Sequence, residues 1–205
     1  MSAQFSRLVA PDGPYDTLQL GLKLLDPRDA LTLASPDMLA NGAGNCAVAG
    51  TCDARALGTP ISVRYGRMAV LPGSASELEA LDVPLLAQYF DGSGFRPQTA
   101  DLCSLYALGD ATLSDYQLAL DAGETNAAGP VTPTTLVAGR DSSAAPLLLS
   151  APGAGNAGSV LLQLTTPFWL QFDWTGLGIS NPAARMHFGQ FRGHDRVVFW
   201  GERLD

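Results

Sequence analysis

Glycine and proline recur every few residues along this chain, and this spacing constrains the fold more than any other feature of the sequence. The 22 glycines and 14 prolines among 205 residues are more than long helices tolerate. The segments between them are short and rich in apolar residues that alternate or favour strands, which is typical of sandwiches and barrels. We expect an all-β protein: an antiparallel β-sandwich, immunoglobulin-like or jelly-roll-like, with long Gly/Pro-rich loops and little helix.

Eight segments are predicted as strands: Tyr15–Leu25, Ile61–Leu71, Val83–Phe90, Leu113–Leu120, Ser159–Thr165, Phe168–Asp173, Ala184–Phe191 and Asp195–Glu202. The last two are expected to form a hairpin, because Gly193 between them supplies the positive φ that a tight turn needs. One helical turn is expected at Ser76–Leu81, with Ser74 as its cap. Residues 121–146 are rich in Ala, Gly, Thr and Pro, so they are either a linker or a long surface loop.

The charge of the chain excludes two classes of partner. The formal net charge is −8, Lys23 is the single lysine, and the arginines are dispersed. Binding to nucleic acid or to an anionic membrane surface requires clustered Lys and Arg, so neither is expected. No apolar run reaches 18 residues, so we expect no membrane span. Residues 1–11 lack a signal-peptide core, so the chain is either cytosolic or a fragment whose export signal lies upstream.

Three cysteines bear on the cellular compartment. Cys46 and Cys52 lie in a glycine-rich segment with five residues between them, a spacing that does not match zinc knuckles. We expect a local Cys46–Cys52 disulfide that closes this loop, which would require an oxidising compartment. The alternative is that both thiols are reduced.

The sequence motifs that would indicate an enzyme lack the neighbouring residues that each kind of site requires. Gly153–Gly158 has the glycine spacing of a dinucleotide fingerprint, but Pro152 and Pro167 leave no room for the helix that must follow, so we expect a glycine-rich hairpin loop. His187 and His194 cannot assemble a metal site by themselves, and no Gly-x-Ser-x-Gly elbow is present. We therefore predict no catalytic residues, no cofactor and no metal.

Carboxylates are numerous, but most occupy turn sequences such as Asp91-Gly-Ser-Gly94. Asp in this context bonds to nearby backbone N–H groups, so a turn is favoured over an acid pair for glycoside hydrolysis. Asp26–Asp29 offers oxygens for Ca²⁺ but lacks the dense spacing of a calcium loop.

Aromatic residues provide the best candidate for a binding surface. Trp169, Phe172 and Trp174 lie close together, and in a strand Phe172 and Trp174 would share one face while Trp169 faces the other. We expect one face to be core. An exposed Trp169 or Trp174 beside polar groups would instead indicate a carbohydrate-binding platform.

A set of ordered phrases spans nearly the whole chain. They are Gly13-Pro-Tyr15, Arg64-Tyr-Gly-Arg67, Ser76-Glu-Leu78, Val83-Pro-Leu85, Ala87-Gln-Tyr-Phe-Asp-Gly-Ser-Gly-Phe95, Asp101-Leu-Cys-Ser104, Phe188-Gly189 and Arg192-Gly-His-Asp-Arg-Val-Val-Phe-Trp200. In this order they resemble the C-terminal domain of MshQ-type proteins, which are associated with the MSHA type IV pilus of Gram-negative bacteria.

The resemblance implies an exported protein at the cell surface or outside the cell, with residues 1–205 as the C-terminal β domain of a larger chain. It implies contacts with other domains of the parent protein and with pilus components, and it implies no catalytic residue. It also implies that Cys103 pairs with a cysteine upstream of this sequence. Two hypotheses follow: a structural or assembly module that acts through protein contacts, or an adhesin domain that binds carbohydrate or another surface.

Four arginines stand in the phrases of this resemblance: Arg64, Arg67, Arg192 and Arg196. They neighbour glycine or aromatic residues on predicted strands, where a guanidinium can stack on rings or pair with acids such as Glu77 and Asp195. We predict that these arginines organise the sheet and do not contact a substrate.

Overall fold

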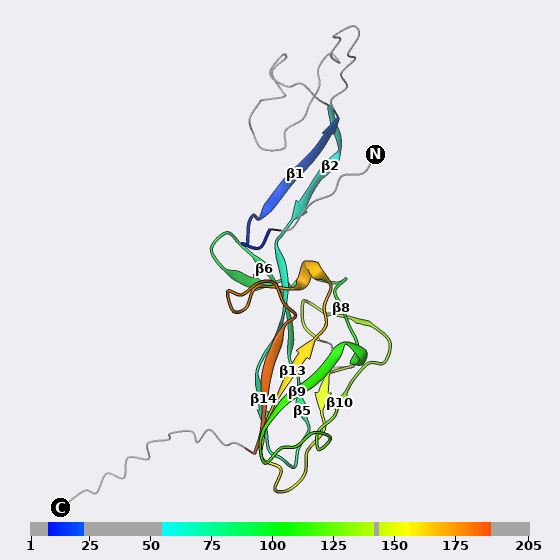
Figure 1. Ribbon diagram of the computed structural model, residues 1–205. Coiled ribbons are helices and arrows are strands. Elements are labelled where there is room, and N and C mark those ends of the chain that lie inside the picture. The colour runs from blue at the N-terminus through cyan, green and yellow to red at the C-terminus, as the bar shows by residue number, and fades with distance from the viewer. Residues whose placement is uncertain (1–7, 23–54, 142–143, 190–205) are drawn as a thin grey trace, which may run out of the picture.

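The computed structural model describes residues 8–22, 55–141 and 144–189, and this part of the chain consists of β-strands and two short 3₁₀ helices (Figure 1). The strands are β1 (Tyr15–Leu22), β2 (Arg55–Val63), β3 (Gly66–Val70), β4 (Gly73–Ala75), β5 (Leu81–Asp82), β6 (Leu85–Phe90), β7 (Phe95–Pro97), β8 (Leu105–Tyr106), β9 (Ala111–Leu118), β10 (Ala127–Ala128), β11 (Thr134–Thr135), β12 (Leu148–Leu149), β13 (Gly158–Leu164) and β14 (Ala183–Phe188). The helices are η1 (Leu108–Asp110) and η2 (Phe168–Leu170).

One layer of the molecule is a four-stranded sheet in the order β4-β14-β13-β9. Its two central strands alternate in side-chain burial: Val160, Leu162 and Leu164 of β13 point into the core, as do Met186 and Phe188 of β14. This period of two is what a strand with one buried face produces. The β13 pairings with β9 and β14 are antiparallel, whereas the short β4 joins β14 in parallel.

The opposite layer consists of the three-stranded sheets β3-β6-β7 and β10-β12-β5. Met68 of β3, Leu85 of β6 and Leu149 of β12 are fully buried and belong to the same hydrophobic cluster as the inward side chains of β13 and β14. Burial of each such side chain contributes about 1.5–3 kcal/mol. The prediction of an all-β, predominantly antiparallel sandwich is therefore confirmed.

Residues 121–146 pack on this same core where the structure describes them. They contribute β10 and β11, and Leu136 at the end of β11 is buried within the common cluster. The segment is thus a folded part of the sandwich surface.

Strands β1 and β2 form a separate two-stranded antiparallel ribbon, which projects beyond one end of the sandwich in Figure 1. Two contacts connect the ribbon side to the sandwich: the Tyr65 hydroxyl donates to the Val9 carbonyl at 3.0 Å, and Arg64 reaches Asp16 at 3.4 Å. Arg64 and Tyr65, between β2 and β3, therefore mark the junction of the ribbon and the sandwich.

Several sequence predictions need correction. The single strand predicted at Ile61–Leu71 is divided between the ribbon and the sandwich, with a break at Arg64 and Tyr65. The strand predicted at Phe168–Asp173 is replaced by η2, because Leu170 N–H bonds back to the Pro167 carbonyl. The loop at 153–158 joins β12 to β13, which do not pair, so it is a turn but not a hairpin loop.

The segment predicted as a helical turn forms a single hydrogen-bonded turn over Ser76–Glu79 and no helix. Glu79 N–H bonds to the Ser76 carbonyl, and the Ser76 hydroxyl, not that of Ser74, accepts from Leu78 N–H. The second arm of the C-terminal hairpin lies outside the described residues. Its first arm is an interior strand, because Met186–Phe188 are bonded to β13 on one side and to β4 on the other.

Candidate ligand-binding site

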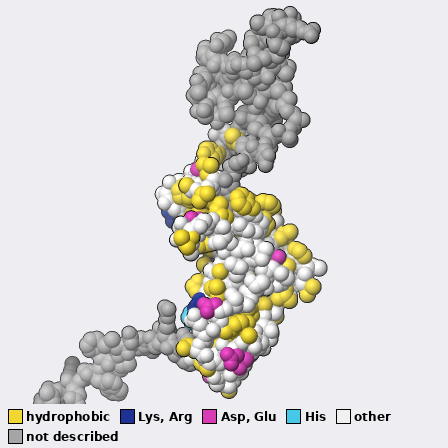
Figure 2. Space-filling view, in the orientation of Figure 1, with side chains coloured by type: hydrophobic (Ala, Val, Ile, Leu, Met, Phe, Trp, Pro, Cys, Tyr) yellow, Lys and Arg dark blue, Asp and Glu magenta, His cyan; other side chains and the backbone are white. Residues whose placement is uncertain are grey.

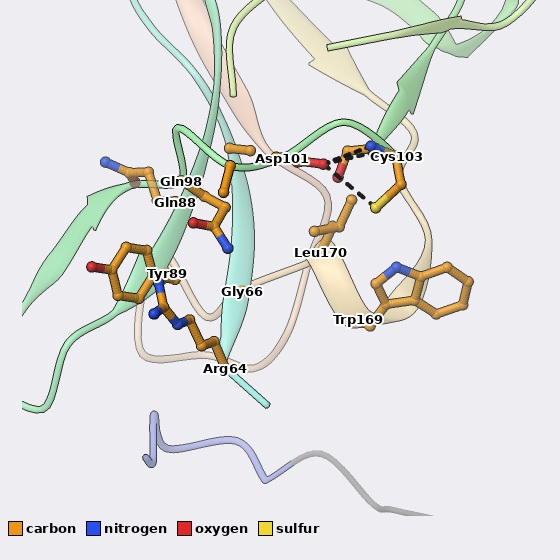
Figure 3. Close-up of a pocket in the computed structure, with 12 residues that line it drawn as sticks. Arg64, Gly66, Gln88, Tyr89, Gln98, Asp101, Cys103, Trp169 and Leu170 are labelled. Carbon is orange, nitrogen blue, oxygen red and sulfur yellow. Dashed lines mark hydrogen bonds between the residues drawn. The ribbon is translucent and has the colours of Figure 1, made fainter. Parts of the chain in front are cut away.

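An open pocket of about 310 Å³ lies where the sandwich meets the ribbon. Figure 3 shows the residues that line it. It is formed by β3, β6, the loop that follows β7, and η2. Trp169 lies beside its polar lining, which includes Arg64, Gln88, Tyr89, Gln98, Asp101 and Ser104.

Strand register explains why a pocket forms here. Met68 of β3 lies opposite Ala87 of β6, and both are buried. Two residues along each strand on the same face, Gly66 lies opposite Tyr89, beyond the densest part of the core. Gly66 has no side chain to fill this space. Leu170 also lines the pocket, and its nearest atom would be 3.7 Å from a β-carbon placed on Gly66.

Trp169 stands on a short, braced turn. Its neighbour Leu170 is buried in the core, whereas Trp169 is 66% exposed. The turn is held by Asn181, whose side-chain oxygen accepts from Thr166 N–H and from the Gln171 amide, each at 3.0 Å. The indole is therefore presented to solvent by a fixed backbone.

Asp101 anchors the loop on another side of the pocket. Its Oδ1 accepts from Cys103 N–H at 3.0 Å and from Ser104 N–H at 2.9 Å. Burial by itself raises the pKa of Asp101, but the hydrogen bonds from Ser104 and Cys103 outweigh it and hold that pKa below its usual value. The carboxylate is thus ionised and only 7% exposed, with its charge met largely by backbone N–H groups.

Arg64 supplies the positive charge of the pocket. Its guanidinium carbon lies 4.3 Å from the centre of the Tyr89 ring, and its Nη2 is 3.4 Å from Asp16 Oδ1 on β1. The Asp16 oxygen also accepts from the Ser62 hydroxyl at 3.0 Å. Stacking on Tyr89 orients the guanidinium plane, so its edge remains available for in-plane hydrogen bonds.

The opposite face of the β3-β6-β7 sheet carries an aromatic cluster around Arg67, defined as Tyr65, Phe90, Phe95, Phe172 and Trp174. The Arg67 guanidinium carbon lies 3.6 Å from the Phe95 ring centre, 4.6 Å from that of Phe172 and 4.7 Å from that of Trp174. Arg67 Nε also donates to the Gln88 side chain at 2.8 Å, and burial lowers the pKa of the guanidinium. Arg67 thereby ties the segment after η2 to the sheet.

The structure separates the tryptophans that the sequence placed together. Trp169 lines the pocket, whereas Trp174 belongs to the aromatic cluster and is 37% exposed. On the face drawn in Figure 2, hydrophobic side chains gather over the end of the sandwich from which the ribbon projects. The polar lining from Gln98 to Ser104 was not predicted as a site, although Asp101-Leu-Cys-Ser104 was one of the phrases in the resemblance.

Arg64 and Arg67 stack on rings as described, and Arg64 pairs with Asp16 rather than with Glu77. Arg192, Arg196, Cys46 and Cys52 lie outside the described residues. Cys103 is a free, exposed thiol at the pocket.

The described ranges contain neither a metal-binding cluster nor a membrane-spanning helix. No group of three or more His, Cys, Asp or Glu side chains there is arranged to hold a metal ion. No helix in that part of the chain has the length and hydropathy to cross a membrane.

Comparison with known proteins gives one family. The fourth domain of DUF6701 matches residues 64–203, which begins at Arg64 and so contains the sandwich and the pocket but not the ribbon. No curated protein and no solved structure matches the chain. The resemblance to MshQ-type proteins stays a prediction. Since the match covers more than half of the sequence, the chain belongs to the DUF6701 family and contains its fourth domain.

Proposed function

We propose that this chain is a non-enzymatic carbohydrate-binding module of an exported bacterial surface protein. The observation that carries the proposal is Trp169, which is 66% exposed on a braced turn beside a polar pocket. Exposure alone does not mark a site, since other large apolar side chains of this chain are also exposed, but Trp169 is the exposed ring that borders the polar pocket. Sugars combine apolar C–H faces, which stack on an indole, with hydroxyl groups, which need hydrogen-bonding partners.

The pocket lining supplies those partners. Gln98 and Tyr89 can both donate and accept, Arg64 donates, and the Asp101 carboxylate accepts. A few convergent polar groups beside an aromatic wall are the usual composition of a small-ligand site. Asp101 is the one carboxylate among the described lining residues, and its Oδ1 accepts from two backbone N–H groups, which suits binding better than acid–base chemistry.

Glycan-array screening followed by titration calorimetry tests the proposal. Trp169→Ala is expected to abolish binding to whichever glycan the wild-type chain retains. Phe168→Ala is the matched control, because Phe168 is an exposed ring of the same turn, at 57%, and is not among the lining residues of the pocket. Absence of binding to every glycan, or equal loss in both variants, would contradict the proposal.

Export and surface location are supported by the resemblance to MshQ-type proteins. The matching experiment is fractionation of cells that carry the full-length parent protein. Peptide mass spectrometry without reduction adds a second test, with a Cys46–Cys52 link expected and Cys103 unlinked to either. A link from Cys103 to Cys46 or Cys52 would overturn this assignment.

A structural or assembly role through protein contacts is a second candidate, and the ribbon favours it. Strands β1 and β2 pair only with each other in the described part of the chain and precede the matched domain. An isolated two-stranded ribbon is marginally stable in water, so contact with another domain of the parent protein or with a pilus component would stabilise it. Cross-linking of the full-length protein, mapped to β1 and β2, tests this role.

A further inference from the structure

Arg64, which lines the pocket, already pairs with a carboxylate. Its partner Asp16 comes from β1, at 3.4 Å, and both side chains are substantially exposed, at 34% for Arg64 and 58% for Asp16. An exposed ion pair at this distance is weak, because water solvates both charges. A ligand that offers a carboxylate in the plane of the guanidinium can therefore replace Asp16.

The orientation of Arg64 favours such a replacement. The cation–π contact with Tyr89, 4.3 Å from the guanidinium carbon to the ring centre, holds the group at the pocket without a hydrogen bond to its N–H donors. Among side chains, arginine is the one that pairs with a carboxylate through two parallel hydrogen bonds. The pair with Asp16 uses a single Nη2 contact within the described residues, so a bidentate ligand gains a bond over Asp16.

The two charges of the pocket lie on different sides of it. Figure 3 shows Arg64 and Asp101 apart, with Trp169 to one side. A sugar ring over Trp169 can then direct a carboxylate to Arg64 and hydroxyl donors to Asp101. The opposite orientation would place the ligand carboxylate against the Asp101 carboxylate, which is unfavourable.

We propose that the pocket binds sugars that carry a carboxylate, such as uronic or sialic acids, with Arg64 as the residue that selects the acid and Asp16 as its displaceable substitute. This inference rests on the carbohydrate-binding function proposed above and names the ligand class of that site. It gives Arg64 a ligand contact, in place of the purely structural role that the sequence predicted for it. The net charge of −8 opposes acidic ligands at long range, but the Debye length at physiological salt is only about 8 Å, so the local pair decides.

Two pairs of probes that differ in charge test the inference by calorimetry on the full chain. They are trigalacturonate against its methyl ester, and sialyllactose against lactose. The acidic member of at least one pair is expected to bind about tenfold tighter, the equivalent of one charge-assisted bidentate contact. Equal affinities within both pairs would overturn the inference.

Variants separate Arg64 from the rest of the site. Arg64→Met keeps the stem on Tyr89 but loses the donors, so it should weaken the neutral probe modestly and bring the ratio of acidic to neutral affinity to about one. Asp16→Asn should increase affinity for the acidic probe about twofold to fivefold, because it removes the competitor. Arg96→Met is the matched control, since Arg96 forms a comparable surface pair with Asp91 outside the pocket.

The outcomes distinguish this inference from the proposed function. A persistent acid preference in Arg64→Met, or weaker acid binding in Asp16→Asn, overturns the inference. If Trp169→Ala still abolishes binding of the neutral probes in that case, the pocket binds carbohydrate but does not select for acidic sugars. If no sugar binds the wild-type chain, both fail.

Discussion

The guanidinium carbon of Arg67 lies 3.6 Å from the centre of the Phe95 ring, in the middle of the aromatic cluster. Phe95 belongs to β7, while Phe172 and Trp174 come from the segment after η2, almost eighty residues later in the sequence. The same η2 turn carries Trp169. Arg67 therefore connects the stability of the sheet to the position of the proposed ligand-binding ring.

Replacement of Arg67 by alanine should destabilise the fold. A partly desolvated cation–π contact contributes about 0.5–2 kcal/mol, and the variant also loses the hydrogen bond to Gln88. We expect Arg67→Ala to lower the free energy of unfolding by about 1–3 kcal/mol and Arg67→Lys to recover part of it, measured by urea denaturation. If Arg67→Ala kept its stability but lost a binding activity, the structural role predicted for this residue would be wrong.

The sandwich could be predicted because its strands are short apolar segments that bury one face. Val160, Leu162 and Leu164 stand two residues apart and are buried, in a short run of residues that favour strands. The run from Ile61 to Leu71 looked like one strand because alternation does not show where a chain changes partners. Its first residues pair with the ribbon, and its last pair with β6.

The candidate site was predictable only in part. Trp169 was identified as a possible platform, but its placement in a strand was wrong because Pro167 starts a local 3₁₀ turn that bonds within itself. The pocket joins β3, β6, the 98–104 loop and η2, which are far apart in sequence. No local pattern marks Gln98 or Asp101 as neighbours of Trp169, because only strand register and loop packing bring them together.

Two strand glycines should respond differently to the same change. A β-carbon on Gly158 would fall within steric overlap of the Gln117 carbonyl and 2.6 Å from Leu120 Cβ, where β9 bulges against β13. We expect Gly158→Ala to cost about 1–3 kcal/mol or more in thermal or urea unfolding. Gly66→Ala is the control, because its nearest atoms would be 3.7 Å away, and its stability should be unchanged or slightly higher.

The turn predicted at Asp91–Gly94 is confirmed, and it should contribute to acid sensitivity. Asp91 accepts hydrogen bonds from the Arg96 side chain and from Ser93 and Gly94, and these hold the pKa of its carboxyl well below the ordinary value of 3.8. A depressed native pKa adds stability above pH 3.8 and loses it progressively as the pH falls below that value. Urea midpoints measured from about pH 2.5 to 6 should fall less steeply in Asp91→Asn than in the wild type. Parallel curves in the two proteins would contradict the expectation.

The thiol of Cys103 should react slowly despite its exposure at the pocket. The negative charge of Asp101, and the hydrogen bond between the thiol and that carboxylate, raise the pKa of Cys103. Because the thiolate is the nucleophile, less of it is present at a given pH below the pKa, and alkylation slows accordingly. We expect iodoacetamide at about pH 8 to modify Cys103 faster in Asp101→Asn than in the wild type, with rates read from peptide mass mapping so that Cys46 and Cys52 are counted separately. Asp91→Asn serves as the control for loss of a distant carboxylate and should leave the rate at Cys103 unchanged, whereas equal rates in all three proteins would show that Asp101 does not control this thiol.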